Sequence, residues 1–430
     1  MLRKEENDLL THIGPSTPGG AWIRRYWQPA ALSEEISIGG APLPVRLLGE
    51  DLVLFRDEAG QPGLLGIHCA HRGADLSYGR IEDGGLRCIY HGWLYDRAGR
   101  CLEQPGEPEG STFHERIRQT AYPCVERSGV VFAYLGPGEP PLVPAYDFLT
   151  APDECVTATK YFQDCNYLQG NEGNFDPQHL SFLHRLLSTS PDDFRNAIHS
   201  GDKTPTIDPV ETDFGIQLYA VRKVDDQQNF VKVRAFIMPN GSLVDSRGDG
   251  CYHSDWHVPI DDTHHWKYSI AYKRSGLDRE ADLALRKRPA EADYHLKRNR
   301  TNRYLQNRDE MRSEVYIGMG RDFIVHDTWA TEGEGPIYDR SSEHLGYTDC
   351  GIIAMRNLML GGIRAVQEGR DPLGVVRDPA RNSFPDVLAR DDMVPSSIPW
   401  RFHWRQRATE PAGTSASSAR HHVSAVQDAD

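Results

Sequence analysis

Short runs of apolar or alternating residues, separated by turns, dominate residues 31–140. Examples are Asp51–Phe55 and Gly129–Leu135, and Gly, Pro or Asp residues bound such runs. Runs of this length and period predict β-strands. The Pro- and Gly-rich tract 136–144 predicts a linker. We therefore expect a first, all-β domain over residues 31–140, preceded by a lead-in over residues 1–30.

The pattern changes after residue 140. Residues 166–187 have a helical pattern, and the charged helix formers of 278–312 predict a solvated helix or excursion. A further helix is predicted from Thr348-Asp349 to about Gly369. Its expected apolar stripe is Ile352, Ile353, Met355, Met359 and Ile363. Between these segments lie four β-like runs, at Gly215–Val221, Phe230–Met238, Cys251–Pro259 and His265–Tyr272.

The alternation within these four runs predicts a curved antiparallel sheet. The chain is thus expected to have an α+β fold, in which the all-β domain precedes a second domain with a curved antiparallel sheet flanked by helices. We place that second domain at residues 141–405. The remaining residues, 406–430, are rich in Ala, Ser and Gly and are predicted to be disordered.

Composition narrows the classes of function. The 430 residues are 39% hydrophobic and 26% charged, as in ordinary globular proteins. The formal net charge of −14 argues against a nucleic-acid partner, which would call for a basic face. No apolar run approaches the roughly 18 residues that span a bilayer. The N-terminus lacks the apolar core of a signal peptide, so we expect no membrane association and a cytoplasmic location.

Four metal-ligating residues occur as two short pairs, Cys69-x-His71 and Cys88-x-x-His91. Short spacing lets one loop present two ligands to the same site. Structural zinc sites of this composition usually place two Cys on one arm and two His on the other. Here each arm carries one of each, which suits a two-iron, two-sulfide cluster with both thiolates on one iron and both imidazoles on the other. A zinc-stapled pair of loops is the alternative.

The stretch Ile67–Trp93 resembles the Rieske iron–sulfur signature. The resemblance implies that residues 31–140 form a Rieske 2Fe-2S domain. It also implies the four cluster ligands, which are Cys69, His71, Cys88 and His91.

A second constellation is Asp176, His179 and His184, spaced D-x-x-H-x-x-x-x-H. Asp176 followed by Pro177 predicts the N-cap and first position of a helix. On an ideal helix His184 lies about 140° round from His179. Both imidazoles could then reach one metal only if the helix is distorted. Two His and one carboxylate leave positions open on ferrous iron; two ordinary surface or core histidines are the alternative.

The two constellations in this order resemble the large (α) subunit of Rieske non-haem iron ring-hydroxylating oxygenases, particularly its phthalate dioxygenase-like branch. The resemblance covers roughly residues 5–365. Stretches that carry it, besides the two constellations, are Leu9–Pro15, Arg25–Pro29, Asn166–Gly173 and Gly335–Gly346.

The resemblance implies roles for individual residues. His179 and His184 would be ligands of a mononuclear Fe(II). Asp176 would be the acid that links a Rieske histidine of one subunit, matched here by His91, to an iron-ligand histidine of its neighbour. The third ligand would be a late Asp five residues before a Glu. Asp327 fits this spacing, and Asp322 is a second candidate.

The resemblance further implies a terminal oxygenase that hydroxylates an aromatic substrate with dioxygen. Its electrons would come from an NAD(P)H-dependent flavin and iron–sulfur reductase or from a ferredoxin. A homotrimer or a dimer of trimers is implied as well.

The branch acts mostly on aromatic carboxylates, and a carboxylate calls for Arg or Lys in an otherwise apolar pocket. Candidate substrate residues are Arg222, Lys232 and Arg234. Lys232 and Arg234 share one face of a predicted strand, which could also be an exposed face. Lys232 stands where we expect Arg in phthalate-acting relatives, so phthalate itself is in doubt.

Three other functions stay open at this point. A Rieske monooxygenase that carries out O- or N-demethylation would have the same metal sites. A Rieske electron carrier without oxygenase activity would not need the D-x-x-H-x-x-x-x-H motif or the later acid. A zinc-stabilised binding protein would be colourless.

Overall fold

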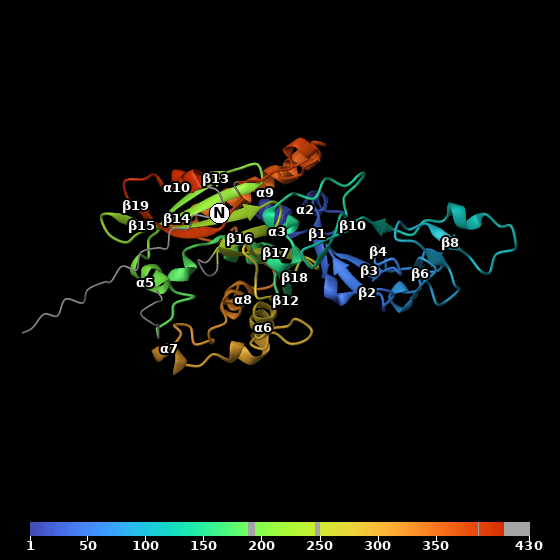
Figure 1. Cartoon of the computed structure of the whole chain (residues 1–430), viewed down its shortest axis with the longest axis horizontal. Helices are drawn as coiled ribbons and strands as arrows, with labels where there is room; N and C mark the ends of the chain where they lie inside the picture. Colours follow the sequence, from blue (N-terminus) through green and yellow to red (C-terminus); the bar gives the residue numbers. More distant parts are fainter. Residues whose placement is uncertain (188–193, 246–249, 386, 408–430) are drawn as a thin grey trace, which may run out of the picture.

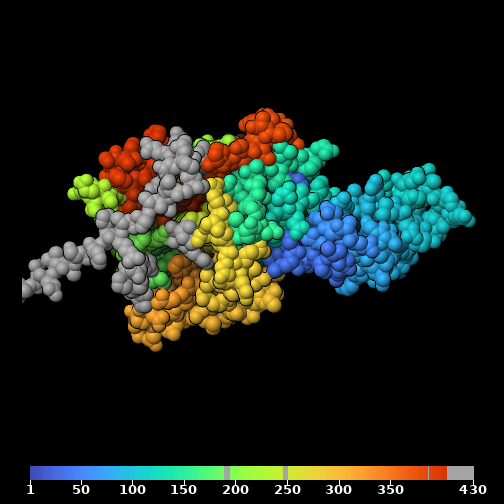
Figure 2. Space-filling model, viewed as in Figure 1, coloured from blue at the N-terminus to red at the C-terminus, as the bar shows by residue number. Residues whose placement is uncertain are grey.

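The computed structural model describes residues 1–187, 194–245, 250–385 and 387–407. Strands of the N-terminal part gather at one end of the molecule, and a large sheet with helices around it forms the other end (Figure 1). In the space-filling view the N-terminal part extends as a lobe from the larger body (Figure 2). No helix of the described ranges is long and apolar enough to cross a membrane.

The N-terminal lobe is built from short antiparallel strands in three small sheets, ordered β1-β11-β10, β2-β3-β4-β9 and β5-β6-β7-β8. The strands are β1 (Gln28–Leu32), β2 (Leu43–Leu47), β3 (Glu50–Arg56), β4 (Pro62–Gly66), β5 (Arg80–Glu82), β6 (Gly85–Arg87), β7 (Leu94–Tyr95), β8 (Cys101–Glu103), β9 (Ala121–Tyr122), β10 (Cys124–Arg127) and β11 (Val130–Ala133). A hydrophobic core of this lobe includes Val53, Phe55 and Leu86 together with Cys69 and Cys88. The predicted all-β first domain is confirmed.

The second part contains an antiparallel sheet of order β12-β18-β17-β16-β15-β14-β13, with β19 paired to β15. Its strands are β12 (Val156–Gln163), β13 (Thr206–Glu211), β14 (Gly215–Lys223), β15 (Gln228–Ile237), β16 (Gly241–Asp245), β17 (Cys251–Pro259), β18 (His265–Lys273) and β19 (Arg390–Pro395). The four runs expected from alternation correspond to β14, β15, β17 and β18. The α+β fold with an antiparallel sheet and helices is confirmed.

Helices pack around this sheet. They are α1 (Lys4–Thr11), α2 (Pro18–Ile23), α3 (Asp147–Thr150), α4 (Tyr167–Phe175), α5 (Phe194–Gly201), α6 (Arg279–Lys287), α7 (Glu310–Ser313), α8 (Phe323–Gly333), α9 (Cys350–Gln367) and α10 (Trp400–Arg407). Short 3-10 helices are η1 (Ser33–Glu35), η2 (Leu76–Tyr78), η3 (Phe113–Arg116), η4 (Asp153–Cys155), η5 (His179–Ser181), η6 (Arg300–Leu305), η7 (Tyr347–Asp349) and η8 (Pro379–Arg381). Helix α4 contacts both β17 and α8.

The main hydrophobic core joins the two parts. It includes Ala31–Leu32 of β1 and residues 130–135, together with Phe236 of the large sheet and Met359 of α9. The boundaries proposed at residues 30, 140 and 405 therefore stay predictions. Of the predicted tail, residues 408–430 lie outside the described residues.

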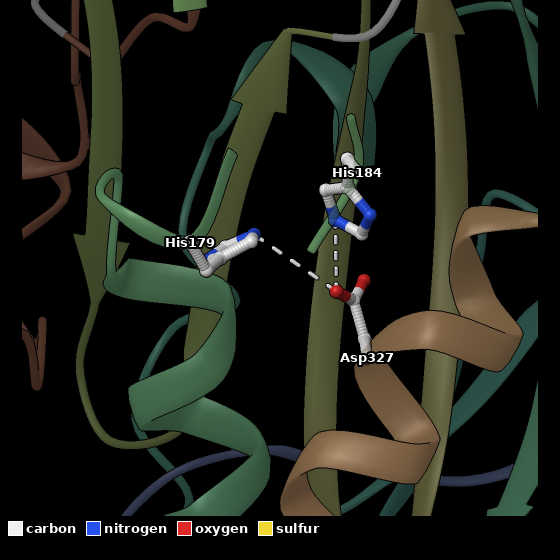
Figure 3. A group of neighbouring side chains, drawn as sticks. All are labelled: His179, His184 and Asp327. Carbon is white, nitrogen blue, oxygen red and sulfur yellow. Dashed lines mark ion pairs between the residues drawn. The ribbon is translucent and has the colours of Figure 1, made fainter. Parts of the chain in front are cut away.

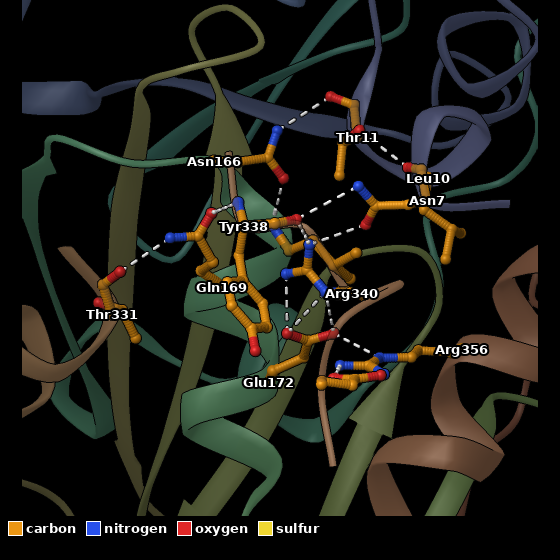
Figure 4. A network of polar contacts seen from close by, with 12 residues as sticks. Asn7, Leu10, Thr11, Asn166, Gln169, Glu172, Thr331, Tyr338, Arg340 and Arg356 are labelled. Atoms are coloured by element: carbon orange, nitrogen blue, oxygen red, sulfur yellow. Dashed lines mark hydrogen bonds and ion pairs between the residues drawn. The ribbon is translucent and has the colours of Figure 1, made fainter. Parts of the chain in front are cut away.

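Helix α4 is tied to distant segments by a buried polar network (Figure 4). Glu172 of α4 accepts hydrogen bonds from Arg340 at 2.8 Å and from Arg356 of α9 at 2.6 Å. Arg340 also donates to Asn7 of α1 at 3.2 Å. Arg340 is fully buried and Arg356 is 4% exposed. Because these buried charges are paired and hydrogen-bonded, the cluster ties α4 to α1, to α9 and to the segment that carries Arg340.

Two helix predictions need correction. Residues 166–187 are not one helix: α4 ends at Phe175, and Asp176 is its C-cap rather than the N-cap of a new helix. Pro177 explains the end, because the residue before proline is disfavoured in the helical region; Asp176 has an extended ψ of 122°. In α9, Ile353 is 42% exposed, since it points about 100° away from the buried face that begins with Ile352.

Candidate metal centres and substrate cavity

The first centre lies on two equivalent turns of the N-terminal lobe. In one, the Gly73 amide donates to the Cys69 carbonyl at 2.8 Å, and in the other the Gly92 amide donates to the Cys88 carbonyl at 2.9 Å. Both glycines have positive φ, +73° and +78°. Such a conformation favours glycine because it has no Cβ. The sequence thus builds two matching loops, each of which carries one Cys and one His.

The two cysteines of this centre are more deeply buried than its two histidines. Cys69 and Cys88 are each 3% exposed, whereas the His91 imidazole is exposed. The ring centroids of His71 and His91 are 4.6 Å apart. A cluster held here would have its thiolate-bound iron inside and its imidazole-bound iron towards the surface, which fits an asymmetric two-iron cluster.

The surroundings of the sulfurs also fit a cluster. Burial and the neighbouring Cys69 raise the pKa of the Cys88 thiol, so two thiolates at this place need a positive partner such as iron. The Tyr95 hydroxyl lies 3.1 Å from the Cys69 sulfur and can donate to it. Hydrogen bonds of this kind tune the potential of a cluster. Trp93 stacks on the His71 ring at 4.3 Å and 8°.

The second centre brings together His179, His184 and Asp327, whose ligand atoms all lie within 4.8 Å of one another. Nε2 of His184 is 2.9 Å and Nε2 of His179 is 3.9 Å from Oδ1 of Asp327. The three side chains point towards one another (Figure 3). The segment that carries the two histidines is distorted as predicted. The α-helix ends at Phe175, and the chain then forms the 3-10 turn η5.

The protonation states of these groups suit a divalent metal. Burial lowers the pKa of His184 to about 4, so its imidazole is neutral at pH 7 and keeps a lone pair. Burial alone would raise the pKa of Asp327, but His184 and His179 hold it well below its usual value. Two imidazoles and one ionised carboxylate form a donor set that non-haem iron accepts.

Asp322, the second candidate for the carboxylate ligand, has a different partner. It precedes α8, and its carboxylate forms an ion pair with Arg288. Asp327 lies one turn further along the helix, on the side that faces the two histidines. The geometry therefore favours Asp327.

Asp176 lies beside this centre. Its carboxylate accepts hydrogen bonds from the amides of Gln178 at 2.7 Å and His179 at 3.1 Å, and lies 3.4 Å from Nδ1 of His179. The capping bonds expected from the sequence thus exist, but they close a turn after α4 instead of starting a helix. The carboxylate can contact His179 and keep lone pairs for another partner. Within the single chain, Asp176 and His91, both described, form no hydrogen bond or ion pair with each other.

A cavity of about 420 Å³ opens from the second centre. Five cationic side chains line it together with His179, His184 and Asp327; they are Arg195, Lys232, Arg234, Lys267 and Arg286. Of these five, only Lys232 and Arg234 are substrate residues predicted from the sequence. Lys267 was within reach of the period-two pattern of β18, but Arg286 was not, because it lies in the stretch expected to be a solvated helix and is in fact 8% exposed.

Acidic partners already bind three of the cations. Arg195 pairs with Asp391 at 2.6 Å, Lys267 with Asp255 at 3.1 Å and Arg286 with Asp282 at 2.7 Å.

The three candidate substrate residues have different surroundings. Arg234 is buried and donates to the carbonyls of Asn174 at 2.9 Å and Asp176 at 2.8 Å. Arg222 is fully buried, donates to the carbonyl of Pro177 at 2.9 Å and is absent from the described cavity lining. Lys232 lines the cavity at 7% exposure and has no hydrogen bond or ion pair with other described residues, although the charges of Asp245 and Asp391 act on it. Lys232 is the cation best placed to receive an anionic ligand.

Two families match the chain. The Rieske [2Fe-2S] domain matches residues 26–123, and the LigXa C-terminal domain like family matches residues 133–421. Together they cover both metal centres described above.

Known oxygenase subunits are similar along most of their length. Phenoxybenzoate dioxygenase subunit alpha of Ectopseudomonas oleovorans is 35% identical, over 85% of this chain and 87% of the relative. The phthalate 4,5-dioxygenase oxygenase subunit of Pseudomonas putida is 34% identical, over 93% and 94%. The 5,5'-dehydrodivanillate O-demethylase oxygenase subunit of a Sphingobium species is 34% identical, over 89% and 85%.

Among solved structures, the terminal oxygenase of carbazole 1,9a-dioxygenase from Novosphingobium sp. KA1 has the same fold. Its TM-score is 0.57 at 22% identity, over 82% of this chain and 94% of that one. Two metal centres of the expected composition, the two matched families and relatives of this extent lead to one conclusion. The chain belongs to the Rieske non-haem iron ring-hydroxylating oxygenases, as an oxygenase component with a Rieske 2Fe-2S cluster and a mononuclear non-haem iron.

Proposed function

We propose that this protein is a terminal oxygenase that dihydroxylates an aromatic carboxylate, with dioxygen and with electrons from an external donor. The observation that carries the proposal is the position of Lys232, a cation that forms no hydrogen bond or ion pair with another described residue and lies in the wall of the cavity that opens from His179, His184 and Asp327. Burial and the charge of Arg234 lower the pKa of Lys232, and the charges of Asp245 and Asp391 offset this only in part, so the cation is costly in this wall. A carboxylate ligand would remove that cost on binding.

The proposal gives residues in and near the cavity separate roles. His179, His184 and Asp327 would hold the iron from one side and leave its other side to the cavity. Lys232 would bind the substrate carboxylate and so orient the ring. When bound, the iron supplies the chemistry that activates dioxygen. Arg234 and Arg222 would act indirectly, because they hold the carbonyls of the segment that carries Asp176 and Pro177.

Electrons would enter through the Rieske lobe and leave through the exposed His91 imidazole. Because His91 and Asp176 do not meet within one chain, Asp176 would bridge the path of the electron from His91 of a neighbouring subunit, packed head to tail, to His179. This arrangement requires a closed ring, and a homotrimer or a dimer of trimers provides one. The electron donor would be a flavin and iron–sulfur reductase or a ferredoxin; complexes of carbazole 1,9a-dioxygenase oxygenase with ferredoxin support the latter type.

Demethylation is the second candidate, and it is supported by the O-demethylase relative that is 34% identical. The metal centres do not separate the two reactions, since the outcome depends on which substrate atom lies nearest the iron.

Product analysis with isotopically labelled dioxygen tests the proposal. The purified protein is combined with an electron-donating reductase and a panel of aromatic acids and their methoxy derivatives. Two labelled oxygen atoms in a cis-diol would support dihydroxylation. Release of formaldehyde, with a phenolic product that keeps its original oxygen, would instead establish an O-demethylase. A reduced cluster that consumes no dioxygen with any acid would contradict the oxygenase role and favour an electron carrier.

A further inference from the structure

A second histidine, His326, lies behind the candidate iron ligand His184. The Nδ1 atoms of the two imidazoles are 3.2 Å apart. The other nitrogen of His326, Nε2, is 2.8 Å from the carbonyl oxygen of Gly320. His326 is fully buried and His184 is 9% exposed, so bulk water does not compete for these hydrogen bonds.

The chemistry of the three groups gives this chain of hydrogen bonds a single direction. The carbonyl of Gly320 can only accept, so Nε2 of His326 must carry a hydrogen. In a neutral imidazole Nδ1 is then an acceptor. Nδ1 of His184 must therefore be the donor, which leaves the lone pair of His184 on Nε2. That atom lies 2.9 Å from Oδ1 of Asp327, a separation of two acceptors that a metal ion bound to both would bridge.

We propose that His326 is a positioning residue that fixes the tautomer and ring orientation of His184, so that its Nε2 lone pair is presented to the mononuclear iron. The inference rests on the proposed role of His184 as a ligand. Neighbours that hold the second nitrogen of a ligating histidine generally set its tautomer and raise its basicity.

One face of helix α8 supplies three side chains that surround the His184 ring. Phe323, His326 and Asp327 follow one another at i, i+3 and i+4, a spacing that places side chains together on a helix. Phe323 stacks on the His184 ring at 4.5 Å and 19°. The helix thus provides a wall for the ring, an acceptor for its Nδ1 and a carboxylate beside its Nε2.

The carbonyl at the end of the chain is itself held in place. The amide of Gly320 donates to Oε1 of Glu310 at 2.9 Å. Gly320 has a φ of +77°, a conformation that other residues rarely adopt. The carbonyl orientation therefore does not depend on His326, and a substitution of His326 leaves the backbone acceptor in position.

Two amide substitutions separate this role from simple packing. His326→Asn places a carboxamide oxygen near the position of Nδ1, where it can accept from His184. His326→Gln places its carboxamide near the position of Nε2, where it can still donate to Gly320 but cannot accept from His184. His326→Leu removes both hydrogen bonds and keeps an apolar side chain.

The measurement is the affinity of the mononuclear site for Co(II), by competition with a chelator, on full-length protein that retains its 2Fe-2S cluster. We expect His326→Gln and His326→Leu to weaken binding by about 10- to 100-fold and His326→Asn by less than about 3-fold. The visible spectrum of bound Co(II) should change for Gln and Leu, whereas cluster absorbance reports an intact fold.

Equal affinity of the Gln variant and the wild type would overturn the inference, as would equal losses for Asn and Gln. His184→Ala distinguishes this failure from failure of the proposed ligand set. If His184→Ala binds Co(II) as the wild type does, the ligand set is wrong. If it loses Co(II) and His326→Gln does not, only the role of His326 is wrong.

Discussion

The Nε2 atom of His184 lies 2.9 Å from Oδ1 of Asp327, although the first residue follows a short 3-10 turn and the second lies on α8. With His179, these residues form a cluster of three ligand atoms beside a cavity of about 420 Å³. A metal held from one side only keeps coordination positions free for small molecules. A substrate in this cavity would lie beside those free positions.

Removal of the carboxylate should empty the mononuclear site and spare the cluster. For Asp327→Ala we expect iron to fall from about three to about two atoms per chain. The Rieske absorption should not change, because its ligands lie in the N-terminal lobe. Asp322→Asn is the matched control, since Asp322 pairs with Arg288. Iron lost from the Asp322 variant instead would reverse the assignment.

Asp176→Asn should slow the transfer of electrons without removal of either metal. The amide keeps an oxygen for the amides of Gln178 and His179 but loses the charge beside the His179 ring. We expect product formation in a single turnover to slow by roughly 100-fold, as misplacement at a reacting site does. Rapid reduction of the cluster by the donor should persist. A wild-type single-turnover rate would exclude the bridging role.

Lys232→Met should impair binding of a carboxylate substrate. A charge-assisted hydrogen bond contributes about 1.5–3 kcal/mol, so KM should rise roughly 10- to 100-fold. Lys232→Arg should restore part of this loss. The methyl ester of the same acid is the internal control, and its KM should hardly change. Arg222→Gln should change KM less than Lys232→Met, because Arg222 contacts the Pro177 carbonyl and not the cavity; the opposite order would return Arg222 to the substrate site.

Glu172→Gln should destabilise the protein. It would leave the buried guanidinium groups of Arg340 and Arg356 without their shared carboxylate (Figure 4). Loss of one partner from a buried ion pair costs about 3–5 kcal/mol of unfolding free energy. Chemical denaturation measures the change. Asp309→Asn removes an exposed pair with Arg312 and should hardly move the midpoint.

The free energy of unfolding should fall in acid, because histidines that are neutral in the folded protein bind protons when the chain unfolds. Burial lowers the pKa of His265 to about 3, and burial together with the Arg286 charge lowers that of His253 to about 3. The unfolded chain binds these protons near pH 6.5. The stabilising contribution is therefore complete above about pH 6.5 and is lost as the pH falls towards about 3. His265→Gln should flatten the decline of melting temperature with pH, and an unchanged decline would contradict this assignment.

Local patterns of the sequence predicted the cluster ligands and several strands. The paired spacing of Cys69-His71 and Cys88-His91 predicted a cluster because short turns bring such ligands to one place. Alternation predicted the four strands β14, β15, β17 and β18, since side chains of a strand alternate between faces. Asp327 could be found only by resemblance, since no local pattern links it to His184.

Where the sequence misled, a neighbouring residue or a distant contact prevailed. The Asp176-Pro177 pair suggested a helix start, but Pro177 instead ends α4 at Phe175. The charged stretch that contains Arg286 suggested a solvated helix, yet Asp282 binds Arg286 at 2.7 Å beside the cavity wall.

The sequence by itself determined the ligand types, their spacing and the strands of the sheet, because these depend on residues close together along the chain. Only the tertiary structure decided that Lys232 faces the cavity while Arg222 and Arg234 hold backbone carbonyls, and that His326 lies behind His184. These relationships depend on the approach of segments distant in sequence, where contact distance and access to water set the state of each charge and each hydrogen.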